Sequence, residues 1–349
     1  MHTPRVDVVV PTYNRPERLR RCLNALARQS FRDLHVIVVD DGSSPPVAPA
    51  LAEEPISNLS ISVVRPERNS GVAEARNLGV MAGSAPLVGF IDDDIIAHED
   101  CIGRLVATLD KHPAPAAVMG SARAPDDWRP TPWNLWEQRT LDSIYQRLRR
   151  GELSPGWRIF FSGISLLRRE DFIAAGGFDA RIRRAEDIEF GARLEEVGVT
   201  LLFNWDAIGL HYSERSFASW LSIARDYGRL QVVIDALHPR LNWLETVHEE
   251  TRGTTLGRRM QMLSILVPKM ADVSAALAPK LAPALCRAGQ TTVAMKVLSY
   301  TYLTSYARSL REAEMHREAT LAPFRGPLPP LPSPAEAKSR IVFTTPPAI

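Results

Sequence analysis

Short apolar runs alternate with a helical pattern through the first hundred residues, and this alternation limits the fold more than any other feature. The runs are rich in Val, Ile and Leu, and they span Val6–Val10, Leu34–Val39, Ile61–Val64 and Leu87–Ile91. Near-continuous apolar runs of this length are typical of parallel strands that are buried on both faces. The segment 15–30 between the first two runs has apolar residues at the spacing of an amphipathic helix. The pattern predicts an open α/β sheet flanked by helices.

Polar, turn-rich segments follow three of these runs where each predicted strand ends. They are PTYNRP after Val10, DDGSSPP after Val39 and the aspartate triplet after Ile91. The carboxyl ends of parallel strands meet at one edge of a sheet, and ligands of open α/β folds collect there. We therefore expect the three segments to converge on one crevice.

The triplet consists of Asp92, Asp93 and Asp94, whose like charges repel one another. Taken alone it has two interpretations. It is either a solvated acidic turn with Asp94 near the cap of the following helix, or a site where a cation removes the repulsion. Mg²⁺ and Mn²⁺ prefer hard oxygen ligands such as clustered carboxylates.

Charge and cysteine content exclude some classes of protein. The chain has 349 residues, enough for one large or two ordinary domains, and a formal net charge of +2. Such a balanced charge gives no reason to expect a nucleic-acid partner. Cys22, Cys101 and Cys286 are too far apart for a metal-binding motif, so we expect small buried side chains in a reducing compartment.

The N-terminus does not read as a signal peptide, because Asp7 interrupts its short apolar segment. No run approaches the roughly 18 apolar residues that a membrane-spanning helix needs. We expect a cytoplasmic protein, with peripheral contact to the inner membrane face as a further option.

Segments spread over about residues 5–213 together resemble glycosyltransferase family 2. They are VDVVVPTYNRPERLRRCLNALARQSFRDLHVIVVDDGSS, RNSGVAEARNLGVMAGSAPLVGFIDDD and GGFDARIRRAEDIEFGARLEEVG, in the order and spacing of that family. The resemblance implies a GT-A fold, which is α/β and Rossmann-like with a mostly parallel central sheet flanked by helices. It also implies a nucleotide-sugar-dependent enzyme that inverts the anomeric centre. Beside these segments, the cation is the favoured interpretation of the triplet.

The resemblance implies a role for each matching residue. The donor-binding set is Pro11, Thr12, Tyr13 and Arg15 around the base, Asp41 as acceptor of a hydrogen bond from the base imide, Arg76 near the diphosphate, and Asp92 or Asp93 near the ribose or sugar. Asp94 is the expected ligand of Mn²⁺ or Mg²⁺, His211 a further metal or diphosphate ligand, and Asp187 the catalytic base.

The chemistry of sugar transfer explains these residue types. A divalent cation stabilises the negative charge that develops on the leaving diphosphate, and a carboxylate on the opposite face removes the proton of the acceptor hydroxyl. Each of the last two residues also has a simpler interpretation. Asp187 could only stabilise a helix N-terminus, and His211 could be a hydrogen-bonded histidine at a strand end. Gly176 and Gly177 are expected to form a tight turn with positive φ.

The predicted organisation has three parts. Residues 1–214 form the GT-A domain, with a nucleotide-binding half at 1–110 and an acceptor and catalytic half at 111–214. Residues 215–320 form a helical C-terminal extension, and the Pro-rich segment 321–349 is expected to be disordered. The helices could cap the acceptor side, form a homodimer interface or rest on a membrane, and the basic, apolar stretch 254–270 suits the last role.

The sequence thus predicts a non-processive glycosyltransferase, because no Q/R-x-x-R-W element follows the expected base. A UDP-sugar is the expected donor, and a glycan, lipid-linked sugar, natural product or protein is the acceptor. Two alternatives stay open. One is a catalytically inactive nucleotide-sugar-binding module, which would not need Asp187. The other is a sugar-phosphate nucleotidyltransferase, which would need a Gly-rich basic signature where the chain has VPTYNRP.

Overall fold

The computed structural model describes residues 3–253 and 269–345. The chain forms two compact units. Unit 1 comprises Met1–Asp127, Asp142–Tyr212 and Leu328–Ile349, and unit 2 comprises Trp128–Leu141 and Ser213–Pro327. The unit boundary after Tyr212 lies close to the boundary predicted at residue 214. Two shorter segments divide differently from the prediction, because 128–141 belongs to the helical unit and 328–349 belongs to unit 1.

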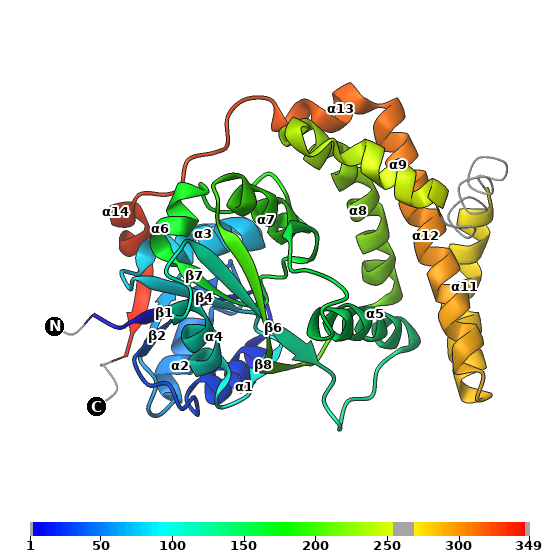
Figure 1. The fold of residues 1–349 in the computed structure, drawn as a ribbon. Coiled ribbons are helices and arrows are strands. Elements are labelled where there is room, and N and C mark those ends of the chain that lie inside the picture. The colour runs from blue at the N-terminus through cyan, green and yellow to red at the C-terminus, as the bar shows by residue number, and fades with distance from the viewer. Residues whose placement is uncertain (1–2, 254–268, 346–349) are drawn as a thin grey trace. The chain divides into compact units, whose positions relative to one another are not determined.

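Unit 1 is built on one sheet. Its strands are β1 (Val6–Thr12), β2 (Leu34–Asp40), β3 (Ile61–Val64), β4 (Leu87–Ile91), β5 (Ile95–Ala97), β6 (Ala116–Arg123), β7 (Ile164–Arg168), β8 (Thr200–His211) and β9 (Ile341–Thr344). Within the described residues these nine strands follow the order β5-β8-β6-β7-β4-β1-β2-β3-β9 (Figure 1). The four apolar runs of the sequence are the cores of β1 to β4, as predicted.

The sheet is mixed. Strands β4, β1, β2 and β3 lie parallel to one another, whereas β7 lies antiparallel between β4 and β6. Among the described strands, four of the eight neighbouring pairs are antiparallel, so the expected predominance of parallel strands holds only for the N-terminal half. The regular strand–helix alternation ends at β4, since no helix separates β4 from β5. The predicted α/β fold class is confirmed.

Helices cover the sheet on both sides (Figure 1). The helices of unit 1 are α1 (Pro16–Leu26), α2 (Val47–Glu53), α3 (Val72–Ala82), α4 (Cys101–Asp110), α6 (Arg169–Ala174), α7 (Glu186–Glu196) and α14 (Pro334–Ser339), with a 3₁₀ turn at Trp157–Ile159. Helix α3 packs on β1, β2 and β3. It approaches so closely that a Cβ on Gly79 would lie 2.5 Å from Val9 Cγ1. The position of α3 is therefore tightly fixed against the sheet.

The expectation of a disordered tail is wrong for much of residues 321–345. Helix α14 packs on α3, and β9 pairs antiparallel with β3 at the edge of the sheet. The prediction of disorder was based on the high proline content of this segment. It overlooked the run Ile341–Thr344, which is rich in β-branched and aromatic residues. Such a run forms a strand once an open sheet edge is available to pair with it.

Unit 2 is helical, as predicted. It contains α8 (Phe217–Leu237), α9 (Trp243–Gly253), α11 (Lys269–Arg287), α12 (Thr291–Met315) and α13 (Arg317–Leu321), with 3₁₀ turns at Pro239–Leu241 and Ala322–Phe324. Helix α5 (Pro132–Arg149) begins in unit 2 and ends in unit 1. Aromatic side chains around the fully buried Trp220 join α8 to α12, for example through Tyr302 at 5.6 Å between ring centroids.

In the part of the chain that the structure describes, no helix combines the length and apolar character that crossing a bilayer requires. Most of the stretch proposed for membrane contact, residues 254–268, lies outside the described residues.

Candidate active site

The three polar segments at the strand ends lie together. Thr12 Oγ1, at the end of β1, donates to Asp93 Oδ2 after β4 at 2.8 Å. The backbone N–H of Asn14 donates to Ser43 Oγ at 2.9 Å, and the N–H of Ser44 donates to Asn14 Oδ1 at 2.8 Å. The loop after β1 is therefore bonded to the loops after both β2 and β4, which confirms the expected convergence.

Asp93 is the buried member of the aspartate triplet. It is 4% exposed, and besides Thr12 it accepts a hydrogen bond from Arg15 Nη1 at 3.1 Å. Burial raises the pKa of the Asp93 carboxyl to about 6, and the charge of Arg15 opposes this rise. Because Asp93 is buried whereas the Asp92 side chain is 38% exposed, Asp92 is the more accessible of the two residues predicted to lie near the donor sugar.

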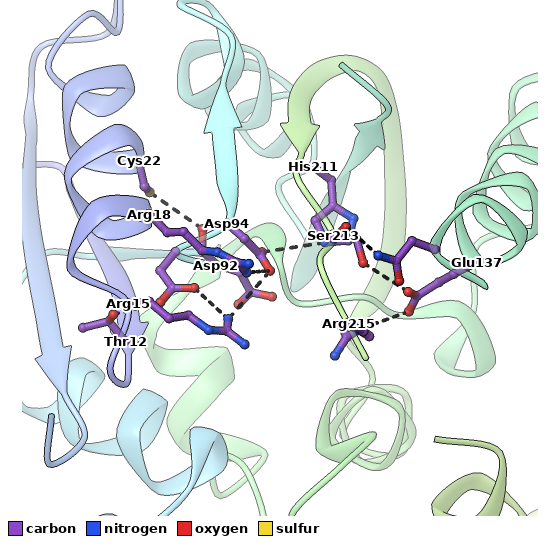
Figure 2. A network of polar contacts seen from close by, with 12 residues as sticks. Thr12, Arg15, Arg18, Cys22, Asp92, Asp94, Glu137, His211, Ser213 and Arg215 are labelled. Atoms are coloured by element: carbon purple, nitrogen blue, oxygen red, sulfur yellow. Dashed lines mark hydrogen bonds and ion pairs between the residues drawn. The ribbon is translucent and has the colours of Figure 1, made fainter. Parts of the chain in front are cut away.

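Asp94 faces His211, the last residue of β8. Their side chains are each 13% exposed, and 3.7 Å separates His211 Nε2 from Asp94 Oδ1. Figure 2 shows Arg15 and Arg18 on one side of Asp94 and His211 on the other. Both guanidinium groups have a nitrogen 3.8 Å from Asp94 Oδ2. Asp94 is therefore a carboxylate surrounded by cationic and imidazole groups, in a place that solvent still reaches.

The pair Asp94 and His211 fits a divalent cation that takes further ligands from a substrate. Metal–ligand distances of about 2.1 Å place neighbouring ligand atoms roughly 3 Å apart in octahedral geometry, close to the observed 3.7 Å. Within the described residues no group of three or more His, Cys, Asp or Glu side chains gathers as a complete metal site. Mg²⁺ and Mn²⁺ commonly bind through one or two protein ligands plus phosphate oxygens and water, so a pair is sufficient.

Asp41 holds the loop that leads into α3. Its carboxylate accepts hydrogen bonds from Ser70 N at 2.8 Å, Ser70 Oγ at 2.9 Å and Gly71 N at 2.9 Å. A carboxylate offers about four acceptor positions. Three of these positions are used, so one acceptor position is left for the predicted contact with a base imide. Asp41 is buried.

Arg76 is enclosed between two carboxylates. It is 3% exposed, its Nη2 donates to Asp92 Oδ1 at 2.8 Å and its Nη1 donates to Glu186 Oε1 at 2.5 Å. The sequence-based prediction placed this side chain near the diphosphate. In the structure its two Nη atoms donate to these carboxylates, so Arg76 joins the end of β4 to the start of α7.

Asp187 stands in the first turn of α7, two residues after Ala185, which has a left-handed φ of 58°. Its Oδ2 accepts a long hydrogen bond from Ser162 N at 3.4 Å, and its Oδ1 accepts one from Ile188 N at 3.0 Å. Burial raises the pKa of the Asp187 carboxyl to about 7, and the neighbouring charge of Glu186 adds to the rise. A carboxyl with a pKa near neutrality is suited to exchange a proton with a substrate.

The remaining predicted residues lie at the end of β1. Pro11 and Thr12 are buried, and Tyr13 follows them with its side chain 48% exposed. Two residues of the site were missed. Arg18 could have been found, because it follows Arg15 by one helical turn at the start of α1. Gly163 carries no sequence signal, yet a Cβ there would lie 2.8 Å from Asp92 Oδ2.

Known proteins are similar to this chain in sequence and in fold. The sequence profile of Glycosyl transferase family 2 matches residues 7–175. Validoxylamine A glucosyltransferase of Streptomyces hygroscopicus subsp. jinggangensis is 29% identical over 70% of this chain and 64% of its own length. The pre-mycofactocin glycosyltransferase of Mycobacterium tuberculosis is 26% identical over 67% of this chain and 48% of its own length. The chain thus spans less than two thirds of these relatives.

A solved structure extends the likeness to almost the whole chain. The mannosyltransferase PcManGT from Pyrobaculum calidifontis, in complex with GDP-Man and Mn²⁺, superposes with a TM-score of 0.60 and 20% identity. The superposition covers 91% of this chain and 89% of the other. The fold is the GT-A fold of glycosyltransferases. Within that class, residues 7–175 match glycosyltransferase family 2.

Proposed function

We propose that this protein transfers one sugar per reaction from a nucleoside diphosphate sugar to an acceptor hydroxyl, with inversion and with help from a divalent cation. The observation that carries the proposal is the chain of contacts from the aspartate triplet to the base. Asp92 and Glu186 bind one guanidinium, and this supports the proposal that the nearby Asp94 and Asp187 act in one site.

Asp94 and His211 would hold Mn²⁺ or Mg²⁺. The cation, when bound, neutralises the charge that develops on the leaving diphosphate. The protein's own contribution here is electrostatic. Arg15 and Arg18, each with a nitrogen 3.8 Å from Asp94 Oδ2, would add positive charge beside the phosphate oxygens of a donor.

Asp187 would act as the general base. Direct displacement needs a carboxylate that accepts the acceptor's proton while the oxygen attacks the anomeric carbon. A base of this kind contributes roughly 10²–10⁴-fold to the rate. The pKa of about 7 allows Asp187 to be ionised before the reaction and protonated after it at physiological pH. A position at a helix N-terminus would lower the pKa of a carboxyl, so the helix position alone does not account for the raised pKa of Asp187.

The donor and acceptor to test first are UDP-glucose and a hydroxyl-bearing natural product. UDP is the commonest nucleotide in the family that this chain resembles, and one relative is named validoxylamine A glucosyltransferase. GDP-sugars are the next donors to test, because a solved structure with a similar fold is a complex with GDP-Man and Mn²⁺. Glycan, lipid-linked and protein acceptors complete the screen.

The decisive experiment is release of nucleoside diphosphate from each donor, with Mn²⁺, with Mg²⁺ and with EDTA, followed by NMR of the product's anomeric centre. We expect release that depends on the cation, is lost in Asp94→Asn and gives an inverted linkage. Tight binding of nucleotide with no turnover for any donor and acceptor would instead favour a binding module. Formation of a nucleotide sugar from a sugar phosphate would indicate the nucleotidyltransferase alternative.

We also propose peripheral contact between unit 2 and an anionic lipid surface in the cytoplasm. Val273, Leu277 and Leu281 lie four residues apart on α11 and are 55%, 55% and 43% exposed, so they form an apolar stripe on one helix face. From Arg252 to Arg287 the sequence has six Lys or Arg and one Asp. Apolar side chains beside cations suit an anionic interface better than a second copy of the same positively charged helix.

Vesicle sedimentation tests this contact. We expect binding to vesicles containing phosphatidylglycerol but not to pure phosphatidylcholine, and loss of binding in Leu277→Glu. A protein that ignores both vesicles and forms a dimer in analytical ultracentrifugation would point to the homodimer interface instead.

A further inference from the structure

The chain re-enters unit 1 through a strap, defined here as residues 328–345. Its first part, from Leu328 to Ser333, has no regular hydrogen bonding and is rich in proline. Solvent exposure along it repeats every three residues, since Pro327, Pro330 and Ser333 are exposed while the residues between are half-buried. A polyproline II segment has three residues per turn, so Leu328 and Leu331 face the same side.

Both leucines contact a pair of glycines. A Cβ on Gly176 would lie 2.6 Å from Leu328 Cδ2, and one on Gly177 would lie 2.4 Å from Leu331 Cδ2. These distances are shorter than any real contact, so the two leucine side chains occupy space that only glycine leaves open. The glycines also have φ of 78° and 67°, which confirms the turn expected from the sequence.

The rest of the strap docks on α3 and β3. Ala337 of α14 is fully buried, and α14 packs along α3. Strand β9 is fixed by backbone bonds at both ends: Arg65 N donates to Arg340 O at 3.0 Å, and Thr345 N donates to Ile61 O at 2.8 Å. The strap thus contacts the rest of unit 1 in three places, namely the Gly176–Gly177 turn, α3 and β3.

Two of these places support the catalytic base. Asn77 of α3 forms two hydrogen bonds with the backbone of Phe178, one to its N–H and one to its C=O, both at 2.8 Å. Arg76, the preceding residue of α3, binds Glu186. The segment from Gly177 to Asp187 is therefore attached to α3 at its start and at its end, and the strap covers both α3 and the turn.

We propose that Leu328 and Leu331 are positioning residues for Asp187. The docked strap holds the Gly176–Gly177 turn against α3, and this keeps the Asn77–Phe178 and Arg76–Glu186 contacts in register. This inference rests on the proposed function, in which Asp187 is the base. A strap that only protected the edge of β3 would stabilise the fold without affecting the reaction.

The test uses the full chain with Leu328→Ser and Leu331→Ser combined. Leu303→Ser, which changes a 36% exposed leucine on α12, is the matched control. Assays run well below the melting temperature of each variant, so that the folded fraction stays near one. We expect kcat to fall at least tenfold while the Kd for UDP with Mn²⁺ changes less than threefold. Replacing Leu331 by Met instead of Ser should keep most of the wild-type kcat, because Met fills the space over Gly177.

Hydrogen exchange gives a readout that does not depend on turnover. We expect faster amide exchange at residues 178–190 in the double variant, and no change at residues 34–43 of β2 and its following loop. Unchanged kcat, or unchanged exchange at 178–190, in a folded variant overturns the proposal. If the wild-type chain transfers no sugar, the proposed function fails, whereas the exchange result still decides whether the strap orders the Asp187 segment.

Discussion

Asp92 and Glu186 bind the same guanidinium, that of Arg76, although they lie on elements far apart in the sequence. Asp92 belongs to the aspartate triplet after β4, and Glu186 precedes Asp187 at the start of α7. The shared guanidinium joins these two segments of the chain.

Replacing Arg76 by Met should destabilise the protein by about 3–5 kcal/mol, because Glu186 becomes a buried carboxylate without its partner. Urea unfolding measures this loss. The control is Arg28→Met, because Arg28 is an exposed residue just after the end of α1. This change should alter stability by less than about 0.5 kcal/mol. Equal urea midpoints for wild type and Arg76→Met would contradict the bridge.

Asp187→Asn should abolish transfer yet stabilise the fold above neutral pH. The folded-state pKa of Asp187 is raised to about 7 from a normal value of 3.8. Between these values the folded state binds the proton more tightly than the unfolded state, so stability falls as pH rises through this window. The amide removes that loss, which we expect to be about 1–2 kcal/mol at pH 8. Melting temperatures at pH 4 and pH 8 test this, since the gain should vanish at pH 4.

The same carboxyl should set the acidic limb of the pH–rate profile. A base works only when ionised, so kcat should rise with pH and level off above about 7. Rates at saturating donor, cation and acceptor between pH 5 and pH 9 give the profile. A limb near pH 4 would mean that the titrating carboxyl has an ordinary pKa and is not Asp187 in this environment.

Removing the proposed metal ligands should weaken cation binding in a graded way. We expect Asp94→Asn to abolish Mn²⁺-dependent UDP binding and His211→Ala to weaken it roughly 10–100-fold. Isothermal titration with and without EDTA measures both. Asp206→Asn, an exposed acid on β8, is the control and should bind as the wild type does. Unaltered binding in His211→Ala would leave Asp94 as the protein's single ligand.

Gly163→Ala tests the space beside Asp92. The added Cβ would lie 2.8 Å from Asp92 Oδ2, so the carboxylate must move and its bond to Arg76 is strained. We expect kcat/KM to fall at least tenfold with a loss of about 1–3 kcal/mol in stability. Gly103→Ala in α4 is the matched change, since its Cβ meets nothing closer than 3.6 Å and Ala favours the helix. Full activity in Gly163→Ala would show that Asp92 has room to adjust.

Strand ends were predictable because two local rules act together. Apolar runs identified β1 to β4, and polar turns after three of them had to share one edge of the sheet. The bonds of Thr12 to Asp93 and of Ser44 to Asn14 follow from that geometry. Gly176 and Gly177 were likewise expected in a positive-φ turn, which the structure has.

The burial and the partners of the individual site residues could not be predicted from the sequence. Sequence alone does not separate the three aspartates, and only packing reveals that Asp93 points to Thr12 and Arg15 while Asp94 faces His211. The two carboxylate partners of Arg76 could not be predicted, because Asp92 and Glu186 come from distant segments. The tail was predicted wrongly for the same reason, since the strand that β9 pairs with lies far away in the sequence.

The pairing of β9 with β3 also has a consequence during protein synthesis. Ile61 and Thr345 are bonded across a separation of 284 residues. Translation at roughly 5–20 residues per second leaves the outer edge of β3 without its neighbour for on the order of tens of seconds. Nascent chains on neighbouring ribosomes can associate through such an open edge, so slow translation of the last third favours aggregation even when every residue of the site is intact.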